Sequence, residues 1–400
     1  MAAGLEQVIS YLETLRFNEE EIKWLSSTQR FNSRFIDYLS KFRFSGKVYA
    51  LPEGTVFFEN EPVLTVIAPL PEAQLVETRI INILHYQTLI ASKAARTVLV
   101  APGKLLVDFG LRRSHGAEAG LLGARAAYLA GFSGSSNVLS EFVFGIPSFG
   151  TMAHSFVLAH DDEENAFENF SRSQPQNVTI LIDTYDTDKA AKKVVHLATR
   201  LQKSGIQIKA VRLDSGDLGD LSFRVRGILD QAGLTGIDIF ASGNLDEEKI
   251  QDLINKGAPI GGFGVGTHLL TSNDFPYLDC AYKLEEYLGR PRRKLSPGKA
   301  TWPGQKEIYR RYDHHGIMTG DLLTLKDDPH AQGESLLKLF MNDGKRVLGE
   351  IKLSDIRSFA VSQLSCLPPA LKRLTPLTHY PVEISVTLKT LTRQLDNNRF

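Results

Sequence analysis

The first hundred residues combine helical and β-like patterns of apolar positions. Residues 4–43 fall into three stretches of helical periodicity, the first of which places Leu5, Val8 and Leu12 on one face. Residues 48–51, 56–58 and 63–67 are short apolar runs separated by turn-forming residues, as is typical of strands. Residues 73–97 follow as one amphipathic stretch. The pattern predicts a helical lead-in, a small sheet and one long helix.

After residue 100 the pattern changes to alternating strands and helices. Apolar runs typical of buried strands occur at 105–107, 179–182, 208–211, 237–240 and 260–265. Helical patterns at 189–202, 221–231 and 247–256 separate the later ones. This alternation predicts βαβ crossovers and therefore a parallel sheet. Periodicity leaves open whether that sheet is an open, doubly wound one or a closed barrel.

The last hundred residues return to a β-rich pattern. Asn342-Asp343-Gly344 lies between apolar runs and is typical of a hairpin turn, and a helical tail follows at 386–395. We therefore predict an N-terminal α+β domain over 1–100, an α/β domain over 101–290, and a β-rich segment over 291–400. The last segment is expected to complete the small N-terminal domain.

Composition excludes several classes of protein. The 46 basic and 46 acidic side chains balance, so nothing predicts a broad nucleic-acid or anionic-membrane surface. Cys280 and Cys366 lie far apart and in no Cys/His cluster, so neither a disulfide framework nor a zinc site is expected. The start shows no leader pattern and no apolar run reaches about 18 residues. We expect a cytoplasmic protein.

Polar, charged or glycine residues follow each predicted strand directly. In parallel α/β folds these positions line the active-site face. The strongest features are Asp183-Thr184-Tyr185-Asp186 and Arg212-Leu213-Asp214-Ser215-Gly216-Asp217. Asp186 and Asp217 precede helices and are expected to cap them, which leaves Asp183, Arg212 and Asp214 for ligand or for one another.

Four further segments carry candidate site residues. Residues 131–137 form a small-residue loop, and 261–267 form a glycine-rich turn where α/β barrels commonly bind phosphate. Phe109 precedes Arg112 and Arg113 at a strand end, and His154 follows a short apolar stretch. Together these residues predict a ligand that is phosphorylated, ribose-like and paired with an aromatic ring.

Six of these motifs resemble, in order, those of the nicotinate phosphoribosyltransferases. The resemblance runs over about residues 1–300, and the last hundred residues share only its general character. The motifs are Phe109-Gly110-Leu111-Arg112-Arg113, Gly131-Phe132-Ser133-Gly134-Ser135-Ser136-Asn137, Gly150-Thr151-Met152-Ala153-His154-Ser155-Phe156, Asp183-Thr184-Tyr185, Val211-Arg212-Leu213-Asp214-Ser215-Gly216-Asp217 and Phe263-Gly264-Val265-Gly266-Thr267.

The resemblance implies the fold and the reaction. The fold would be an irregular α/β barrel with a smaller α+β domain formed from the N- and C-terminal segments. The reaction would join nicotinate to phosphoribosyl pyrophosphate and yield nicotinate mononucleotide and pyrophosphate in NAD salvage. It would be coupled to ATP hydrolysis and therefore formally be that of a ligase. Mg²⁺ would accompany the pyrophosphate groups, and two copies of the chain would form a homodimer with shared active sites.

Site residues are carried over from the same motifs. Phe109 would stack on the pyridine ring, with Arg112 near the nucleotide and Arg212 on nicotinate ribotide. Asp183 and Asp214 would organise ribose or magnesium pyrophosphate, and His154 would be phosphorylated by ATP. The other residues implied in substrate binding are Ser136, Thr151, Ser155, Asn244, Gly264, Gly266 and Thr267, and no protein-held metal centre is expected.

Two alternative functions remain open from the sequence. Nicotinamide phosphoribosyltransferase is similar in fold and motif order but has an aspartate where this chain has Ser136, and a carboxylate there would repel nicotinate. A non-catalytic ligand-binding relative is the second alternative. Family members usually begin with a further helical segment whose tyrosine stacks on the pyridine across the dimer interface, and this sequence is expected to start after it.

Overall fold

A computed structural model describes residues 1–296, 301–329, 331–375 and 378–397. The chain forms two compact units, which we call unit 1 (Met1–Leu89 and Tyr277–Phe400) and unit 2 (Ile90–Pro276). The division falls inside helix α5 (Glu77–Val100), whereas the sequence pattern placed it at the end of that helix. No helix of the described residues is both long and apolar enough to cross a membrane.

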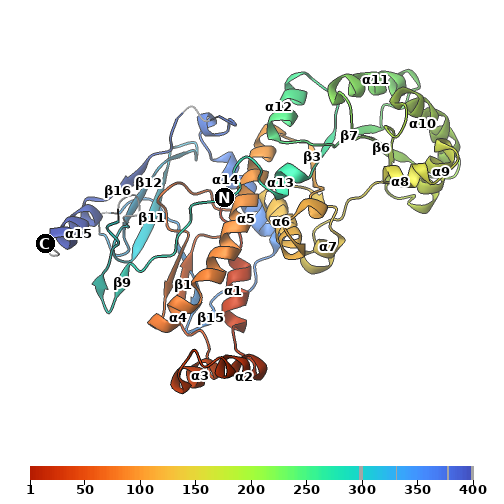
Figure 1. Cartoon of the computed structure of the whole chain (residues 1–400). Helices are drawn as coiled ribbons and strands as arrows, with labels where there is room; N and C mark the ends of the chain where they lie inside the picture. Colours follow the sequence, from red (N-terminus) through yellow and green to blue (C-terminus); the bar gives the residue numbers. More distant parts are fainter. Residues whose placement is uncertain (297–300, 330, 376–377, 398–400) are drawn as a thin grey trace. The chain divides into compact units, whose positions relative to one another are not determined.

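Unit 2 is built on one curled parallel sheet (Figure 1). Its six strands lie in the order β4-β3-β8-β7-β6-β5, and all the neighbours pair in parallel. No pairing of described residues joins β4 to β5, so the barrel that the sequence predicted is irregular and open on one side. The strands are β3 (Leu105–Asp108), β4 (Gly134–Ser135), β5 (Val178–Leu181), β6 (Ile208–Leu213), β7 (Asp238–Ala241) and β8 (Gly262–Val265).

Helices cover the outer side of this sheet, where α10, α11 and α12 lie one after another (Figure 1). Asp186 and Asp217 cap α10 and α11 by accepting hydrogen bonds from the backbone N–H groups of Lys189 and Asp220, as expected. The helices of this unit are α6 (Ala117–Ala130), α7 (Val138–Phe144), α8 (His154–Leu158), α9 (Glu163–Ser173), α10 (Thr187–Gln202), α11 (Leu218–Gln231), α12 (Glu247–Asn255) and α13 (Thr267–Leu270).

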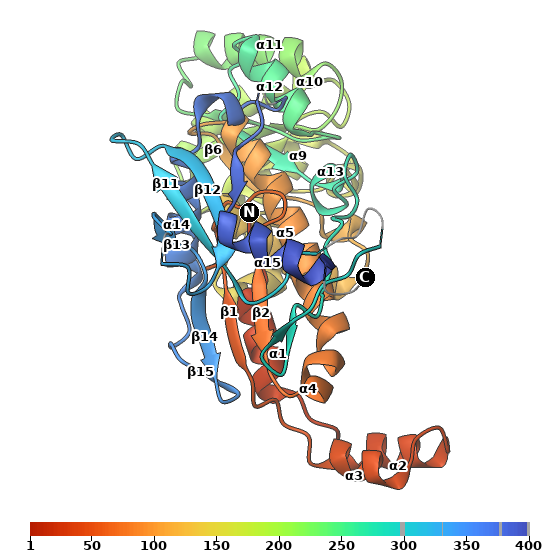
Figure 2. The ribbon, with the colours of Figure 1, turned by 90° about the vertical axis from the view of Figure 1, so that its left-hand side faces the viewer.

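Unit 1 contains two four-stranded sheets, of orders β15-β14-β1-β2 and β13-β11-β12-β16. Strand β1 pairs with β14, so one sheet combines strands from the N-terminal and the C-terminal segments of the chain. The pairs β14–β15 and β11–β12 can be followed in Figure 2. The strands are β1 (Lys47–Ala50), β2 (Leu64–Ile67), β11 (Lys306–Tyr312), β12 (Met318–Leu325), β13 (Glu334–Ser335), β14 (Lys338–Asn342), β15 (Lys345–Arg346) and β16 (Val382–Ile384), with a separate hairpin of β9 (Glu286–Tyr287) and β10 (Arg290–Pro291).

Helices complete unit 1. The apolar face of the first helix packs on β1 and on the start of α5, through Leu5, Val8 and Leu12 against Val48 and Ile80. Helices α2 and α3 lie side by side, away from both sheets (Figure 2). The helices are α1 (Leu5–Thr14), α2 (Glu19–Ser27), α3 (Ser33–Ser40), α4 (Leu70–Leu75), α14 (Leu353–Ser365) and α15 (Val386–Asn397).

The hairpin predicted from the sequence is confirmed, whereas the predicted elements were wrong in three places. Asp343 and Gly344 both have positive φ, as the tight turn between β14 and β15 requires. Residues 56–58 are not a strand, because Glu61 accepts a hydrogen bond from the Phe58 N–H and the Val56 carbonyl accepts one from Arg310. The predicted helix over 73–97 is divided into α4 and α5, and α14 was missed.

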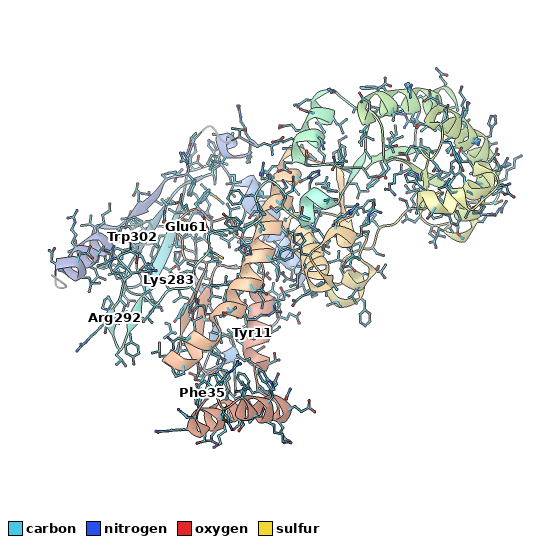
Figure 3. The ribbon with its side chains drawn as sticks, in the orientation of Figure 1. Tyr11, Phe35, Glu61, Lys283, Arg292 and Trp302 are labelled. Carbon is cyan, nitrogen blue, oxygen red and sulfur yellow. The ribbon has the colours of Figure 1, made fainter. Side chains whose placement is uncertain are left out.

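A buried charged cluster lies in unit 1. The side chains of Arg310 and Asp321 are fully buried and form an ion pair, with the Arg310 Nε 2.9 Å from Asp321 Oδ1. Tyr380 donates to the same carboxylate at 2.9 Å, and Glu61, labelled in Figure 3, lies beside it. Burial, followed by the hydrogen bond and the charge of Asp321, raises the pKa of Glu61 to about 9. The cluster therefore carries one ion pair and one protonated carboxyl group at neutral pH.

Candidate active site

The polar residues that follow the strands of unit 2 meet at one edge of the sheet. Because all six strands are parallel, their carboxyl ends lie along the same edge. Asp108 ends β3, Asp183 follows β5, Asp214 follows β6 and Ser242 follows β7. The parallel topology therefore brings these side chains to one edge of the sheet, as we expected from the sequence.

Arg212 is the centre of this cluster. Its Nε donates to Ser242 Oγ at 2.8 Å, its Nη1 to Thr151 Oγ1 at 2.8 Å, and its Nη2 to Asp214 Oδ1 at 2.6 Å. These three acceptors come from three separate segments, so the planar guanidinium is held in one orientation. The side chain is 15% exposed, which leaves it accessible to a ligand.

Two carboxylates belong to the same cluster, and Asp214 is the one that contacts Arg212. Asp183 Oδ2 accepts hydrogen bonds from the Asp214 N–H at 2.9 Å and from Ser215 Oγ at 2.6 Å. Asp183 Oδ1 is buried and has no hydrogen-bond partner among the described residues. Burial raises the pKa of Asp214, but the hydrogen bond from Ser242 and the charge of Arg212 outweigh it, so the pKa lies below the ordinary value. Asp214 is therefore ionised at neutral pH.

His154 faces both carboxylates from the start of α8. Its Nε2 lies 3.6 Å from Asp214 Oδ2 and 4.0 Å from Asp183 Oδ1, and its Nδ1 lies 3.1 Å from Thr184 Oγ1. A ring nitrogen beside carboxylates carries the proton in the neutral ring, and the other nitrogen then keeps its lone pair. The geometry favours the tautomer of His154 that carries its hydrogen on Nε2, with Thr184 donating to Nδ1.

An aromatic surface lies next to Arg212. The Arg212 Cζ is 5.4 Å from the centroid of the Phe109 ring, and Phe240 packs on Phe109 at a tilt, with ring centroids 5.7 Å apart. Gly264 leaves room for this ring, because a Cβ there would lie 2.6 Å from Phe109 Cδ2. Ser136 is held nearby by its N–H, which donates to the Asp108 carbonyl at 2.8 Å.

Asp108 is a residue of this site to which sequence reasoning gave no role. It is fully buried, and its carboxylate accepts hydrogen bonds from the Gly110 N–H at 2.8 Å and from Ser135 Oγ at 2.7 Å. Burial raises its pKa to about 6, although these two hydrogen bonds lower it. Asp108 joins the loop that carries Phe109 to the loop that carries Ser136. The signal in the sequence that could have identified Asp108 is its position at the end of an apolar run.

The turns after β7 and β8 form the remaining side of the site. Gly243 has φ of +96°, and a Cβ there would lie 2.0 Å from the Asp214 carbonyl oxygen, so only glycine fits. Asn244, with φ of +52°, approaches His268 of the β8 turn. Gly264 is buried, and Gly266 and Thr267 follow it at the start of α13.

Two of the expected site residues stand apart from this network. Arg112 lies on a short 3-10 turn (η1, Leu111–Arg113) and Ser155 on α8, and both are exposed. Neither side chain makes a hydrogen bond to another residue that the structure describes. Arg212, Asp183, Asp214, His154 and Thr151 are thus brought together, while Arg112 and Ser155 are free to meet a ligand.

Three family models and many relatives match this chain. The models of the nicotinate phosphoribosyltransferase N-terminal domain, of the family itself and of its C-terminal domain match residues 1–85, 105–288 and 329–392. A nicotinate phosphoribosyltransferase of Mycobacterium tuberculosis is 46% identical over 96% of this chain and 83% of its own length. The chain belongs to the nicotinate phosphoribosyltransferase family. The C-terminal match extends the resemblance beyond residue 300, where the sequence pattern showed only general character.

Other members of the nicotinate phosphoribosyltransferase family agree with this assignment. The Bacillus subtilis enzyme is 37% identical over 96% of this chain and 84% of its own length. The crystal structure of human nicotinic acid phosphoribosyltransferase superposes with a TM-score of 0.86 at 27% identity, and the match covers 99% of this chain and 92% of the human one. The irregular barrel and the small domain are therefore the architecture of this family.

Proposed function

We propose that this chain joins nicotinate to the ribose of phosphoribosyl pyrophosphate, yielding nicotinate mononucleotide and pyrophosphate in NAD salvage. The observation that carries the proposal is the Arg212 guanidinium, which Ser242, Thr151 and the Asp214 carboxylate hold in place beside an aromatic ring. Purified protein is mixed with nicotinate, phosphoribosyl pyrophosphate, Mg²⁺ and ATP, and pyrophosphate is measured. Nicotinamide in place of nicotinate tests the amide alternative, and binding without pyrophosphate release would identify a non-catalytic relative.

The residues of the site have distinct tasks in this reaction. The nicotinate ring nitrogen attacks C1′ of the ribose, the C1′–O bond breaks, and its electron pair leaves with pyrophosphate. Such a transfer passes through an oxocarbenium-like state, so the protein mainly orients the ring and neutralises the departing anion. Phe109 supplies a flat surface for the pyridine, and Arg212 supplies a fixed positive charge next to it.

The two carboxylates fit a magnesium ion that accompanies the pyrophosphate groups. Asp183 Oδ1 is buried without a partner among the described residues, and Asp214 is ionised, so both offer the oxygen ligands that Mg²⁺ prefers. No group of three or more metal-binding side chains occurs in the described residues, so substrate oxygens and water would complete the coordination shell. When bound, Mg²⁺ neutralises charge on the pyrophosphate.

We further propose that ATP phosphorylates His154 and so couples its hydrolysis to the transfer. The carboxylates facing Nε2 favour the tautomer that leaves the lone pair on Nδ1, which Thr184 now holds by a hydrogen bond. In this step a bond forms between Nδ1 and the γ-phosphorus while the bond to the ADP oxygen breaks. Water later cleaves the phosphohistidine and releases phosphate.

His154→Ala is expected to lower nicotinate-dependent ATP hydrolysis at least about a hundredfold, because the nucleophile is lost. Slow formation of nicotinate mononucleotide without ATP should remain, since Arg212 and Phe109 are unchanged. His160→Ala is the matched control, because among the described residues that ring, on the same segment, hydrogen-bonds only to the Phe156 carbonyl and to Asn169. Equal ATPase rates in the two variants would remove His154 from the coupling.

Ser136→Asp is expected to reduce kcat/KM for nicotinate by roughly 1 to 3 kcal/mol, because a second negative charge would face the substrate carboxylate. Ser136 lies beside Phe109, since its N–H bonds to the carbonyl of Asp108. Ser136→Asn has nearly the same size without the charge and should cost much less. If both variants change the ratio of nicotinate to nicotinamide turnover equally, charge at this position does not set the substrate.

We also propose that two copies of the chain associate, with α7 at the contact. Val138, Leu139, Phe142 and Val143 of this helix are exposed by 47–88%, an unusual concentration for a surface helix. The helix begins directly after the loop of Ser136, so a partner there would border the nicotinate site. The molar mass in solution tests the dimer.

Free thiols at Cys280 and Cys366 support our proposal of a cytoplasmic location.

A further inference from the structure

The turn after β7 is held in a costly backbone conformation. Gly243 and Asn244 both have positive φ, which non-glycine residues adopt rarely and only when their surroundings stabilise it. Lys249 of α12 donates to the Asn244 carbonyl at 2.7 Å and so holds the main chain of the turn. The side chain of Asn244 is held by a different contact.

That contact comes from His268, the second residue of α13, which follows the β8 turn. Its Nε2 lies 2.6 Å from Asn244 Oδ1. A side-chain carbonyl oxygen has no hydrogen to give, so Nε2 must donate. The bond fixes the amide of Asn244 with its oxygen toward His268, and both N–H bonds of the amide remain available to another acceptor. His268 Nδ1 is buried and has no partner among the described residues, so this is the one polar contact of that ring there.

The far ends of the two turns are anchored by a separate ion-pair network. Lys93 and Arg96 of α5 both contact Glu247 and Asp274, with Lys93 Nζ 2.9 Å and Arg96 Nη2 3.0 Å from Glu247 Oε1. Glu247 begins α12, after the β7 turn, and Asp274 lies beyond α13, after the β8 turn. Both turns are therefore fixed where they leave the site. The contact between His268 and Asn244 joins them at the site itself.

We propose that His268 is a positioning residue, which orients the Asn244 amide as a hydrogen-bond donor to the ribose or phosphate oxygens of phosphoribosyl pyrophosphate. The inference rests on the proposed function and on the family resemblance, which implies Asn244 and Gly264 to Thr267 in substrate binding. The inference adds His268 to the site, with the role of orienting one hydrogen-bond donor, the Asn244 amide. His268 itself acts through Asn244.

The test compares His268→Ala, which removes the donor, with His268→Gln, whose amide N–H can replace it. Thr271→Ala is the control on the same segment, because that hydroxyl bonds to the Thr267 carbonyl and to no other residue in the part of the chain that the structure describes. His268→Ala should raise KM for phosphoribosyl pyrophosphate roughly five- to tenfold, the loss expected for one hydrogen bond, with KM for nicotinate nearly unchanged. His268→Gln should restore most of this loss, and Thr271→Ala should match the wild type.

Hydrogen–deuterium exchange over residues 242–246 supplies a readout that does not depend on turnover. Exchange there should rise in His268→Ala and return toward the wild-type rate in His268→Gln. A wild-type protein without turnover would reject the proposed function, and exchange would still decide whether His268 holds the turn. Unchanged exchange and unchanged KM in His268→Ala, or a glutamine variant as defective as the alanine one, would overturn the inference.

Discussion

Arg212→Lys is expected to lower kcat/KM for nicotinate by about a hundredfold, the size of effect seen when one preorganised charge-stabilising donor is removed. The guanidinium donates to Ser242, Thr151 and Asp214 from three different nitrogens. Lysine keeps the positive charge but has a single nitrogen on a flexible stem, so it cannot keep all three contacts. The charge would then be less well placed as pyrophosphate leaves.

Arg226→Lys is the matched control for this prediction. That arginine of α11 also makes three contacts within unit 2, to the carbonyls of Ile237 and Leu234 and to Asp230, but it lies at the amino end of β7 and not at the carboxyl ends of the strands. Thermal unfolding followed by circular dichroism checks that both variants fold. Equal values of kcat/KM in the two lysine variants would show that Arg212 has only a structural role.

Arg310→Met is expected to lower the free energy of unfolding of unit 1 by about 3 to 5 kcal/mol, because Asp321 is left buried without its ion-pair partner. Both side chains are fully buried, so water cannot replace the lost contacts. Tyr380 would still donate to Asp321, but one neutral hydrogen bond does not compensate a buried charge. Urea unfolding measures the loss.

Tryptophan fluorescence makes this measurement specific to unit 1. The chain has two tryptophans, Trp24 and Trp302, and both belong to this unit. Trp302, labelled in Figure 3, packs against the apolar cluster that includes Ile308 of β11 and Leu323 of β12, on the strands that carry Arg310 and Asp321. An unfolding free energy equal to that of the wild type in Arg310→Met would show that the buried pair is dispensable.

Glu61→Gln provides the companion test through pH. The folded pKa of Glu61 is raised from 4.5 to about 9, so the stability of its protonated form is fully present below pH 4.5. That contribution is lost as the pH rises toward and through about 9. The glutamine variant does not titrate, and unit 1 should therefore lose less stability between pH 5 and pH 9 than in the wild type. Parallel pH profiles would contradict a protonated Glu61.

The parallel strands, their helices and the motifs at the strand ends could be predicted from the sequence, because each depends on residues close together in the chain. Apolar periodicity located β3 and β5 to β8, and single aspartates identified the caps of α10 and α11. The turn between β14 and β15 followed from Asp343 and Gly344 alone. Local patterns failed around residues 56–58, where the distant Arg310 and the neighbouring Glu61 both bond to the backbone.

Only the tertiary structure decided which of these segments meet. The strand order places β3 beside β8 and β6 between β5 and β7, so Phe109 packs on Gly264, and Arg212 reaches both Thr151 and Ser242. The bond between Asn244 and His268 spans two separate turns. Periodicity determines which face of a strand is buried but contains no information about its neighbour in the sheet, because pairing depends on long-range packing that no short pattern records.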